Sequence, residues 1–297
     1  MAVPHATGTP LTTSGYTLHI ADDPAEVAAA QRLRHEVFAV ELGATLRSGT
    51  VGLDTDDLDP WCDHLIVREE RTGAVVGTYR LLPPGRTDRR YAEQEFDLTA
   101  FDPLRDDLVE VGRSCVHPDH RSGAVINLMW AGIVRYLHLR GRRWLGGCAS
   151  VSVADGGLTA AGVWERVRAG HLAPPPLRVR PHRPWFAEAA AVAGERERNQ
   201  SGVALDTSGS VVPPLLRGYL RLGAWVCGEP AYDPDFAVAD FYVLLSLDRM
   251  NPRYLRHFLG ESATDAARSR PAGAPVTAGA ALRAGGGSPG RRAGATT

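Results

Sequence analysis

The chain has 297 residues, of which 44% are hydrophobic and 23% are charged, and its formal net charge at pH 7 is -1. This composition is typical of a globular protein with a sizeable core. It argues against a nucleic-acid-binding protein, because such a protein needs a basic excess to neutralise phosphates.

Cysteine spacing and apolar runs narrow the class further. Cys62, Cys115, Cys148 and Cys227 lie far apart and form no C-x-x-C pair, so we expect neither a metal site nor a disulfide framework. The N-terminus lacks a signal-peptide pattern, and no stretch of about 18 apolar residues occurs that could span a bilayer. We therefore expect a cytoplasmic protein, with any membrane contact limited to the periphery of the inner face.

Composition divides the chain into three parts. Residues 1–14 and 261–297 contain few large apolar side chains, and the second stretch consists mainly of Ala, Gly, Arg, Pro, Ser and Thr. Such segments bury too little surface to offset the entropy lost on ordering. We therefore predict a flexible N-terminus over 1–14, one folded domain over 15–260 and a disordered tail over 261–297.

Apolar patterning predicts alternating strands and helices in this domain. The first helix begins at Asp23 and Pro24, which form a helix-start signal with Glu26, and runs to Val40. Arg71-Thr-Gly73 is a turn signal between two apolar runs and predicts an antiparallel hairpin. The predicted strands are 16–21, 64–70, 74–82, 108–116, 144–151 and 238–247, and the further helices are 125–140, 160–169 and 186–199, with a proline-rich loop at 174–184.

The order of these elements predicts an α/β (α+β) fold with a mixed, mostly antiparallel sheet flanked by helices. The strands 108–116 and 144–151 are connected through helix 125–140, and such a crossover makes two strands parallel neighbours. One parallel pair is therefore expected inside an otherwise antiparallel sheet.

The turn between strand 108–116 and helix 125–140 is the most informative segment of the chain. It contains Val116, Arg121, Ser122, Gly123 and Ala124. A helix N-terminus presents unpaired backbone N–H groups and a positive dipole end, and both favour a phosphate group. We therefore predict that this loop binds a phosphate group, with Arg121 adding a positive charge.

The same segment carries a family resemblance. Val116-His-Pro118-Asp-His-Arg121-Ser-Gly123 resembles the acyl-carrier motif of the GNAT superfamily, although Ala124 or Val125 stands where a second glycine is usual. Five motifs resemble, in chain order, those of the ornithine lipid acyltransferases, and some of them are also similar to the acyl-homoserine lactone synthases. These motifs are Leu33-Arg34-His-Glu-Val37-Phe38, Asp59-Pro-Trp-Cys62-Asp63-His64-Leu65, Gly77-Thr-Tyr-Arg80-Leu-Leu-Pro, Glu110-Val-Gly-Arg113-Ser114 and Gly218-Tyr-Leu-Arg221-Leu-Gly223-Ala.

This resemblance implies a GNAT-like N-acyltransferase that moves a 3-hydroxyacyl chain from acyl carrier protein to the α-amine of ornithine, forming lyso-ornithine lipid. An acyl-phosphopantetheine thioester is then the co-substrate, and no other cofactor is expected. Acyl carrier protein and a small amino acid acceptor are the expected partners, with coenzyme A as an alternative carrier.

Three residues are candidates for the chemical step. An α-amine has a pKa of about 8 and must lose a proton before it attacks a thioester. Glu110 lies in the strand that would border the thioester and is the candidate general base, acting directly or through water. Arg113 is expected to pair with Glu110, and Ser114 to polarise the thioester or protonate the thiolate. A purely structural ion pair or hydrogen bond is the alternative role for each.

Five residues are candidates for binding the acceptor. Arg80 ends its strand with a planar guanidinium that matches a carboxylate. The resemblance adds Arg34 as well as Phe38, the latter as part of the core or of an acyl-chain tunnel. Asp59 or Asp63 is a candidate for binding an ammonium group, and the alternative is that this acidic loop is merely solvated.

Other functions stay open on the sequence alone. A lactone synthase, or an N-acyltransferase for another amino acid, would keep the catalytic core without recognising a second amine. A non-catalytic module that binds acyl carriers would need Arg121 and Gly123 but not Glu110. The insertion at 174–199 carries arginines that would face the carrier protein or a membrane, or it forms a surface lid.

Overall fold

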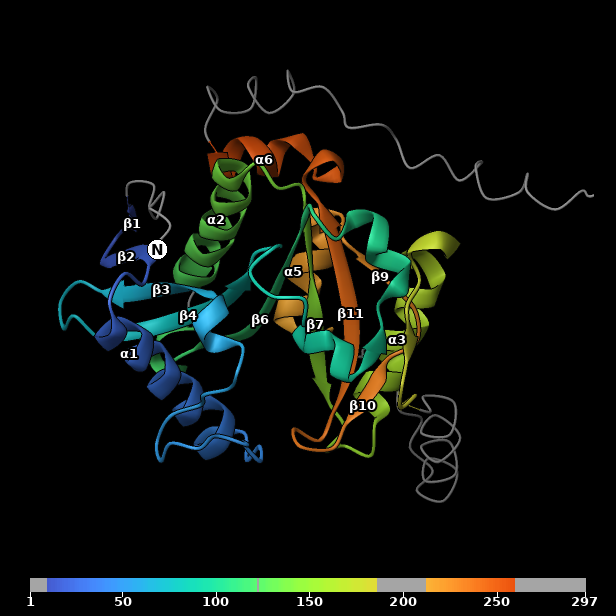
Figure 1. Ribbon diagram of the computed structural model, residues 1–297, viewed down its shortest axis with the longest axis horizontal. Coiled ribbons are helices and arrows are strands. Elements are labelled where there is room, and N and C mark those ends of the chain that lie inside the picture. Colours follow the sequence, from blue (N-terminus) through green and yellow to red (C-terminus); the bar gives the residue numbers. More distant parts are fainter. Residues whose placement is uncertain (1–9, 122, 186–211, 260–297) are drawn as a thin grey trace, which may run out of the picture.

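The computed structural model describes residues 10–121, 123–185 and 212–259 (Figure 1). Its centre is a nine-stranded sheet with the strand order β1-β2-β3-β4-β6-β7-β11-β10, and β9 pairs with β11. β6 and β7 are parallel, and the other pairings are antiparallel. The strands are β1 (Leu11–Thr13), β2 (Tyr16–Ile20), β3 (Asp63–Glu69), β4 (Val75–Leu82), β6 (Leu108–Val116), β7 (Trp144–Ser152), β9 (Trp225–Val226), β10 (Ala231–Asp233) and β11 (Val238–Ser246), and a separate small sheet joins β5 (Phe96–Asp97) to β8 (Arg180–Pro181).

Helices cover both faces of the main sheet. Leu65 and Ile66 are neighbours in β3, so their side chains point to opposite faces. Leu65 packs in the core cluster that includes α2, whereas Ile66 packs against Ala30 of α1. The helices are α1 (Pro24–His35), α2 (Gly123–Arg140), α3 (Leu158–Gly170), α5 (Pro214–Leu222) and α6 (Pro252–Leu259), and short helical turns are η1 (Glu36–Glu41), η2 (Asp59–Trp61), η3 (Tyr91–Gln94), η4 (Thr99–Leu104), η5 (Pro118–His120), η6 (Pro175–Leu177) and η8 (Leu247–Arg249).

The predicted fold class is confirmed. All six predicted strands are present with ends within one residue of the predicted ones, and the predicted parallel pair is β6 and β7. Asp23 caps α1 by accepting the backbone N–H of Glu26, as the start signal indicated, and η1 continues the helical path to Glu41 as a π-helical turn. None of the described helices is both long and apolar enough to cross a bilayer.

The structure also differs from the sequence predictions. Leu11–Thr13, placed in the flexible N-terminus, is strand β1 because it pairs with β2 around a tight turn. The proline-rich loop contains a helical turn and strand β8. Helices α5 and α6 and the edge strand β10 were not predicted. The predicted helix 186–199 and the predicted tail 261–297 lie outside the described residues.

The parallel strands β6 and β7 separate after a short paired stretch. Their register covers three pairs and ends at Glu110 opposite Gly146, although both strands continue (Figure 1). Two local features accompany this divergence. A Cβ atom at Gly147 would overlap the carbonyl oxygen of Val111, and Arg113 has a left-handed backbone with φ of 52°. Beyond Glu110, the edge of β6 that faces β7 therefore carries no paired residues.

We predict that Gly147→Ala destabilises the protein by about 2–3 kcal/mol, because the new methyl group must push β6 away from β7. Chemical denaturation measures this change. The matched control is Gly112→Ala in β6, where a Cβ meets no atom within 4 Å. Its free energy of unfolding should stay within about 1 kcal/mol of the original protein. Equal effects of the two variants would contradict the tight contact at Gly147.

Candidate active site

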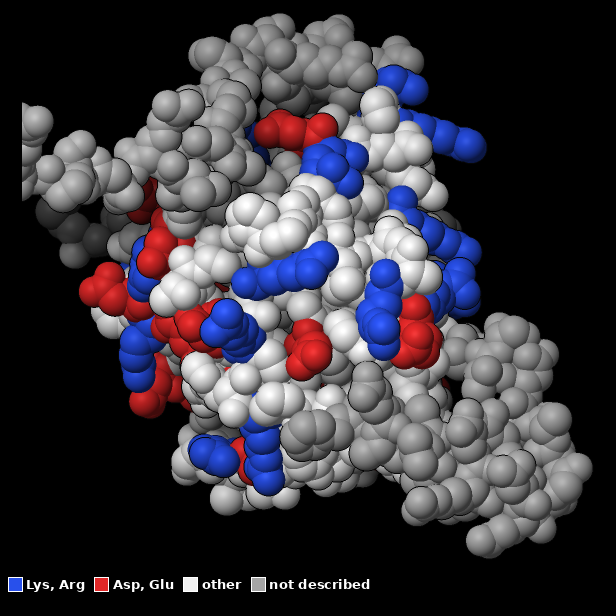
Figure 2. Space-filling view, turned by 90° about the vertical axis from the view of Figure 1, so that its right-hand side faces the viewer, with Lys and Arg blue, Asp and Glu red and all other residues white. Residues whose placement is uncertain are grey.

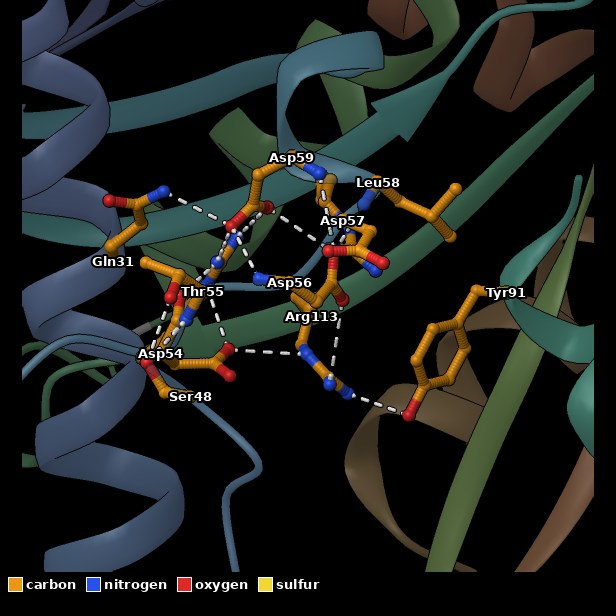
Figure 3. A network of polar contacts seen from close by, with 12 residues as sticks. Gln31, Ser48, Asp54, Thr55, Asp56, Asp57, Leu58, Asp59, Tyr91 and Arg113 are labelled. Atoms are coloured by element: carbon orange, nitrogen blue, oxygen red, sulfur yellow. Dashed lines mark hydrogen bonds and ion pairs between the residues drawn. The ribbon is translucent and has the colours of Figure 1, made fainter. Parts of the chain in front are cut away.

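A buried network of arginines and aspartates lies where α1, β4 and β6 meet the acidic loop 54–59 (Figure 3). Arg34 of α1 contacts Asp54 at 2.9 Å and binds both carboxylate oxygens of Asp59 at 3.1 and 2.8 Å. Arg80 of β4 donates to Asp56 at 2.6 Å and to Asp59 at 3.0 Å. The loop 54–59 is therefore an internal counter-charge for these arginines, and its Asp54 and Asp59 are not solvated.

Arg113 completes this network from β6. Its guanidinium lies 3.2 Å from a carboxylate oxygen of Asp54 and 3.8 Å from one of Asp56, and it donates to the Tyr91 hydroxyl at 3.0 Å. The expected pair between Arg113 and Glu110 is therefore wrong. The left-handed backbone at Arg113 accompanies a register shift in the β4–β6 pairing. Its side chain also lines a large cavity.

Charge in the network is balanced by direct contact. Burial opposes ionisation of Asp59, but hydrogen bonds and positive charge from Arg34 and Arg80 outweigh it and hold the pKa of Asp59 well below its usual range. Burial also opposes ionisation of Asp56, whose pKa is lowered by the charge of Arg80. Both carboxyl groups are therefore ionised at neutral pH and are poor proton acceptors.

Glu110 has partners different from those expected. Its two carboxylate oxygens accept the backbone N–H groups of Tyr91 at 2.7 Å and Ala92 at 2.9 Å, which begin the helical turn η3. Burial raises the pKa of Glu110, and these two hydrogen bonds oppose the rise. Glu110 therefore holds η3 against the last paired position of β6 and keeps a carboxyl group that protonates more readily than an exposed one.

Three further predicted residues lie in different surroundings. Ser114 lies near the Tyr79 hydroxyl, which lies 2.5 Å from the Tyr219 hydroxyl of α5. Phe38 packs edge-on against Phe236, a residue that lines the large cavity. Asp63 is instead used by the fold, because it is buried and contacts three side chains away from the cavity. These are Tyr136 at 2.6 Å, Arg86 at 2.8 Å and Arg140 at 3.2 Å.

The predicted phosphate loop lies directly before α2, and Arg121 makes specific contacts there. Arg121 donates to both carboxylate oxygens of Glu41 at 2.7 and 2.6 Å, and to the carbonyl of Val116 at 3.1 Å. Gly123 begins α2 and, like Ala124, is exposed, whereas Ser122 lies outside the described residues. The guanidinium thus holds a planar, bidentate oxyanion at the start of the loop, the geometry with which arginine also binds phosphate.

A cavity of about 760 Å³ opens beside the network. Its walls come from loop 45–47, loop 56–58, η3, and the segment from β10 to Phe236. The cavity wall combines a guanidinium group, two carboxyl groups and an aromatic ring, which belong to Arg113, Glu95, Asp233 and Tyr91. Sequence reasoning missed Tyr91 and Glu95, which lie in a segment without a clear apolar period.

The outer surface carries charges of both signs. Figure 2 shows the side of the molecule that lies at the right of Figure 1, and acidic and basic side chains are interspersed over its described part. This part of the surface presents no extended field of one sign, in keeping with the net charge of -1.

The chain is similar in sequence to a domain family and to individual proteins. The acetyltransferase (GNAT) domain family matches residues 33–131. An L-ornithine N(alpha)-acyltransferase of Rhodobacter capsulatus is 36% identical over 251 residues, which cover 80% of this chain and 93% of that protein. A second one, from Brucella abortus, is 31% identical over 82% of this chain and 89% of its own.

Two solved structures are also similar to this chain. The AHL synthase LasI covers 82% of this chain and 95% of its own, with 12% identity and a TM-score of 0.46. FeeM, an N-acyl amino acid synthase from uncultured soil microbes, covers 81% of this chain and 93% of its own, with 12% identity and a TM-score of 0.46.

The diverging parallel strands, the loop before α2 and the matching domain family define an acyltransferase of the GNAT class. The identity to the bacterial relatives extends over most of both chains. The chain therefore belongs to the L-ornithine N(alpha)-acyltransferase family.

We predict that Asp59→Asn lowers the free energy of unfolding by about 3–5 kcal/mol at pH 7, because it leaves two buried guanidinium groups without their shared carboxylate. In the original protein, Asp59 adds stability above the unfolded-state pKa of about 4, and this contribution is lost as pH falls through the lower folded-state pKa. Denaturant titration at pH 7 measures the first effect, and titrations from pH 5 down to pH 2 measure the onset of the second.

The neighbouring variant Asp57→Asn is the control, since this side chain is 88% exposed. It should change stability by at most about 0.5 kcal/mol and keep the pH dependence of the original protein. If Asp59→Asn behaved like this control, the buried network would not stabilise the fold.

Proposed function

We propose that this acyltransferase moves a 3-hydroxyacyl chain from acyl carrier protein to the α-amine of ornithine and releases lyso-ornithine lipid. The observation that supports it most strongly is the relation to the L-ornithine N(alpha)-acyltransferases, which extends over 80% of this chain. The arrangement of charges around the diverging strands agrees with the chemistry that this transfer needs.

The donor thioester lies in this proposal between β6 and β7, beyond the last pair at Glu110 and Gly146. Backbone groups on the unpaired edge of β6 can bond to the amides of an extended phosphopantetheine arm. The phosphate of the arm lies at the start of α2, where backbone N–H groups and the helix dipole favour it. Arg121 exchanges the carboxylate of Glu41 for this phosphate.

The reaction needs one proton to leave the amine and one to reach the sulfur. Glu110 takes the proton of the α-amine as the nitrogen attacks the thioester carbonyl carbon, forming the amide C–N bond. Each Glu110 oxygen retains a free lone pair beside its backbone hydrogen bond, so it can still accept this proton. The C–S bond breaks, the departing thiolate gains a proton that the Ser114 hydroxyl relays from solvent, and Glu110 releases the amine proton to solvent.

Arg113 replaces Arg80 in our assignment of the group that binds the acceptor carboxylate. Arg80 is 4% exposed, and its contacts are with the network aspartates. Arg113 lines the large cavity and lies on the same strand as Glu110, three residues further on. A carboxylate held there leaves the α-amine to reach towards Glu110, which lines a small neighbouring pocket that shares Tyr91 with the large cavity.

The proposed product joins a polar head to one acyl chain and belongs in a membrane. We therefore place the reaction at the cytoplasmic face of the membrane, with the protein in peripheral contact. This placement is supported by the amphiphilic chemistry of the product.

We expect a host without aminolipids to make a new ornithine monoacyl amide when it expresses this chain, as detected by mass spectrometry of lipid extracts. Glu110→Gln should lower kcat by about 100- to 10,000-fold, since it removes the general base. A different acylated amino acid would refute ornithine as the acceptor. Full activity of Glu110→Gln would refute the assigned base.

Glu110→Gln also disturbs η3, because an amide has only one acceptor oxygen for two backbone N–H groups. Glu110→Asp and the thermal unfolding curves of both variants therefore serve as controls. A folded Glu110→Gln protein that still binds the donor separates lost catalysis from lost structure.

The donor site predicts a second pair of effects. Arg121→Ala should raise KM for an acyl carrier protein thioester about tenfold, because it removes a charge-assisted contact to phosphate. Glu41→Gln should lower this KM, since it frees Arg121 from a bidentate carboxylate. Steady-state kinetics with carrier protein and coenzyme A thioesters measure both changes. Equal KM values in all three proteins would contradict phosphate binding at Arg121, and a preference for coenzyme A would refute the carrier protein as donor.

A further inference from the structure

A second group of carboxyl groups lies at the large cavity, separate from the arginine–aspartate network. Glu95 follows η3, Asp233 ends β10 and Asp240 lies within β11, so three distant segments bring them together. One carboxylate oxygen of each lies within 4.8 Å of the others. We call these three residues the acidic triad.

The acidic triad differs from the network in its partners. Asp240 accepts the Ser150 hydroxyl at 2.6 Å, and the Cys148 thiol lies 3.9 Å from Glu95. Asp233 accepts backbone N–H groups from the loop that follows it. All of these donors are neutral. Within the part of the chain that the structure describes, no arginine or histidine forms an ion pair with the triad.

Three close carboxyl groups without a cation are costly when they are withdrawn from water. Asp240 is 3% exposed. Burial raises the pKa of both Glu95 and Asp240, and the negative charge of Asp233 adds to the effect. Glu95 therefore holds a proton at neutral pH, and this proton takes the place of the missing positive charge.

The lining of the large cavity is a second reason to expect a ligand beside the acidic triad. Glu95 and Asp233 line its wall, and so does Arg113, together with Tyr91 and Tyr232. Its volume of about 760 Å³ lies in the range of sites for small molecules. One space thus joins a guanidinium suited to a carboxylate with a group of carboxyl oxygens suited to an ammonium ion. A zwitterion that carries an extra amine has this distribution of charge.

The spacing along the sheet matches the same molecule. Ser150 and Cys148 lie on β7 beyond Gly146, which is opposite Glu110. A strand rises about 3.3 Å per residue, so Cys148 lies about 7 Å beyond Gly146. The two amines of an extended ornithine are separated by about 6 Å. An α-amine at Glu110 therefore brings the second amine to the Glu95 side of the acidic triad, next to Cys148, whereas Ser150 and its partner Asp240 lie about 13 Å beyond Gly146.

We propose that Glu95, Asp233 and Asp240 bind the side-chain ammonium of the acceptor and make the enzyme selective for diamino acids. This inference rests on the proposed function, whose acceptor carries a second amine. An ammonium group has three N–H donors, and carboxyl oxygens from three directions can receive them. The cation displaces the proton held by Glu95, so binding releases a proton to solvent.

The test compares ornithine with norvaline, which has the same carbon chain without the second amine. The purified full chain acylates each from the same carrier protein thioester. Glu95→Gln should raise KM for ornithine roughly 10- to 100-fold, because a bond to a charged group is lost. Its kcat/KM for norvaline should stay within about threefold of the original value. The control Glu165→Gln changes a 66% exposed side chain on α3 and should alter neither substrate.

Several outcomes would overturn this inference. An unchanged ornithine KM would remove the triad from the site. An equal loss for both acceptors through kcat would make Glu95 a catalytic or structural residue. Thermal unfolding separates these cases, since Glu95→Gln removes an uncompensated acid and should leave the melting temperature unchanged or higher.

Calorimetry keeps the test independent of the proposed reaction. If the original protein acylated neither acceptor, the proposed function would fail, but ornithine binding could still be measured. Proton release on ornithine binding, detected as a heat that depends on the buffer and lost in Glu95→Gln, would support the ammonium site. Absence of ornithine binding would overturn it. Binding of Mn²⁺ or Ca²⁺ alone, lost in the same variant, would overturn it in favour of a metal site.

Discussion

The burial of three arginines against three aspartates is the constraint on which the rest of this structure depends. Arg34, Arg80 and Arg113 come from three separate elements, and one short loop supplies all of their carboxylate partners. A buried guanidinium without a partner is costly, so these elements are stable only when they assemble together. The network thereby fixes the helix α1, the centre of the sheet and one wall of the cavity relative to one another.

The same region contains carboxyl groups in two opposite environments. Asp59 is surrounded by guanidinium groups and stays ionised, whereas Glu95 and Asp240 form no ion pair and burial raises the pKa of both. Glu110 lies between these extremes, buried but bonded to two backbone N–H groups. Such separation of acid strength over a short distance is what the proposed general base and the proposed ammonium site require beside a rigid frame.

Sequence reasoning found the strands because their apolar runs are long and their side chains are buried on defined faces. It found Glu110 and Arg113 as charges within an apolar strand, but their partners come from the loop 54–59 and from η3, which no local pattern connects to β6. Asp240 carries the same signal in β11 and was overlooked. Edge strand β10 and helix α6 are short, so packing decides their conformation more than their own sequence does.

The left-handed backbone of Arg113 sets the preference of the main chain against the role of the side chain. A side chain in that conformation costs about 1–2 kcal/mol, so the backbone alone favours glycine. A glycine, however, would remove the only guanidinium that joins the Asp54 and Asp56 carboxylates to the Tyr91 hydroxyl in the described structure. The main chain and the side chain thus select for different amino acids. A glycine here would relax the bulge and break the link between the charged network and the cavity, so one residue carries both the backbone strain and the connection between two parts of the molecule.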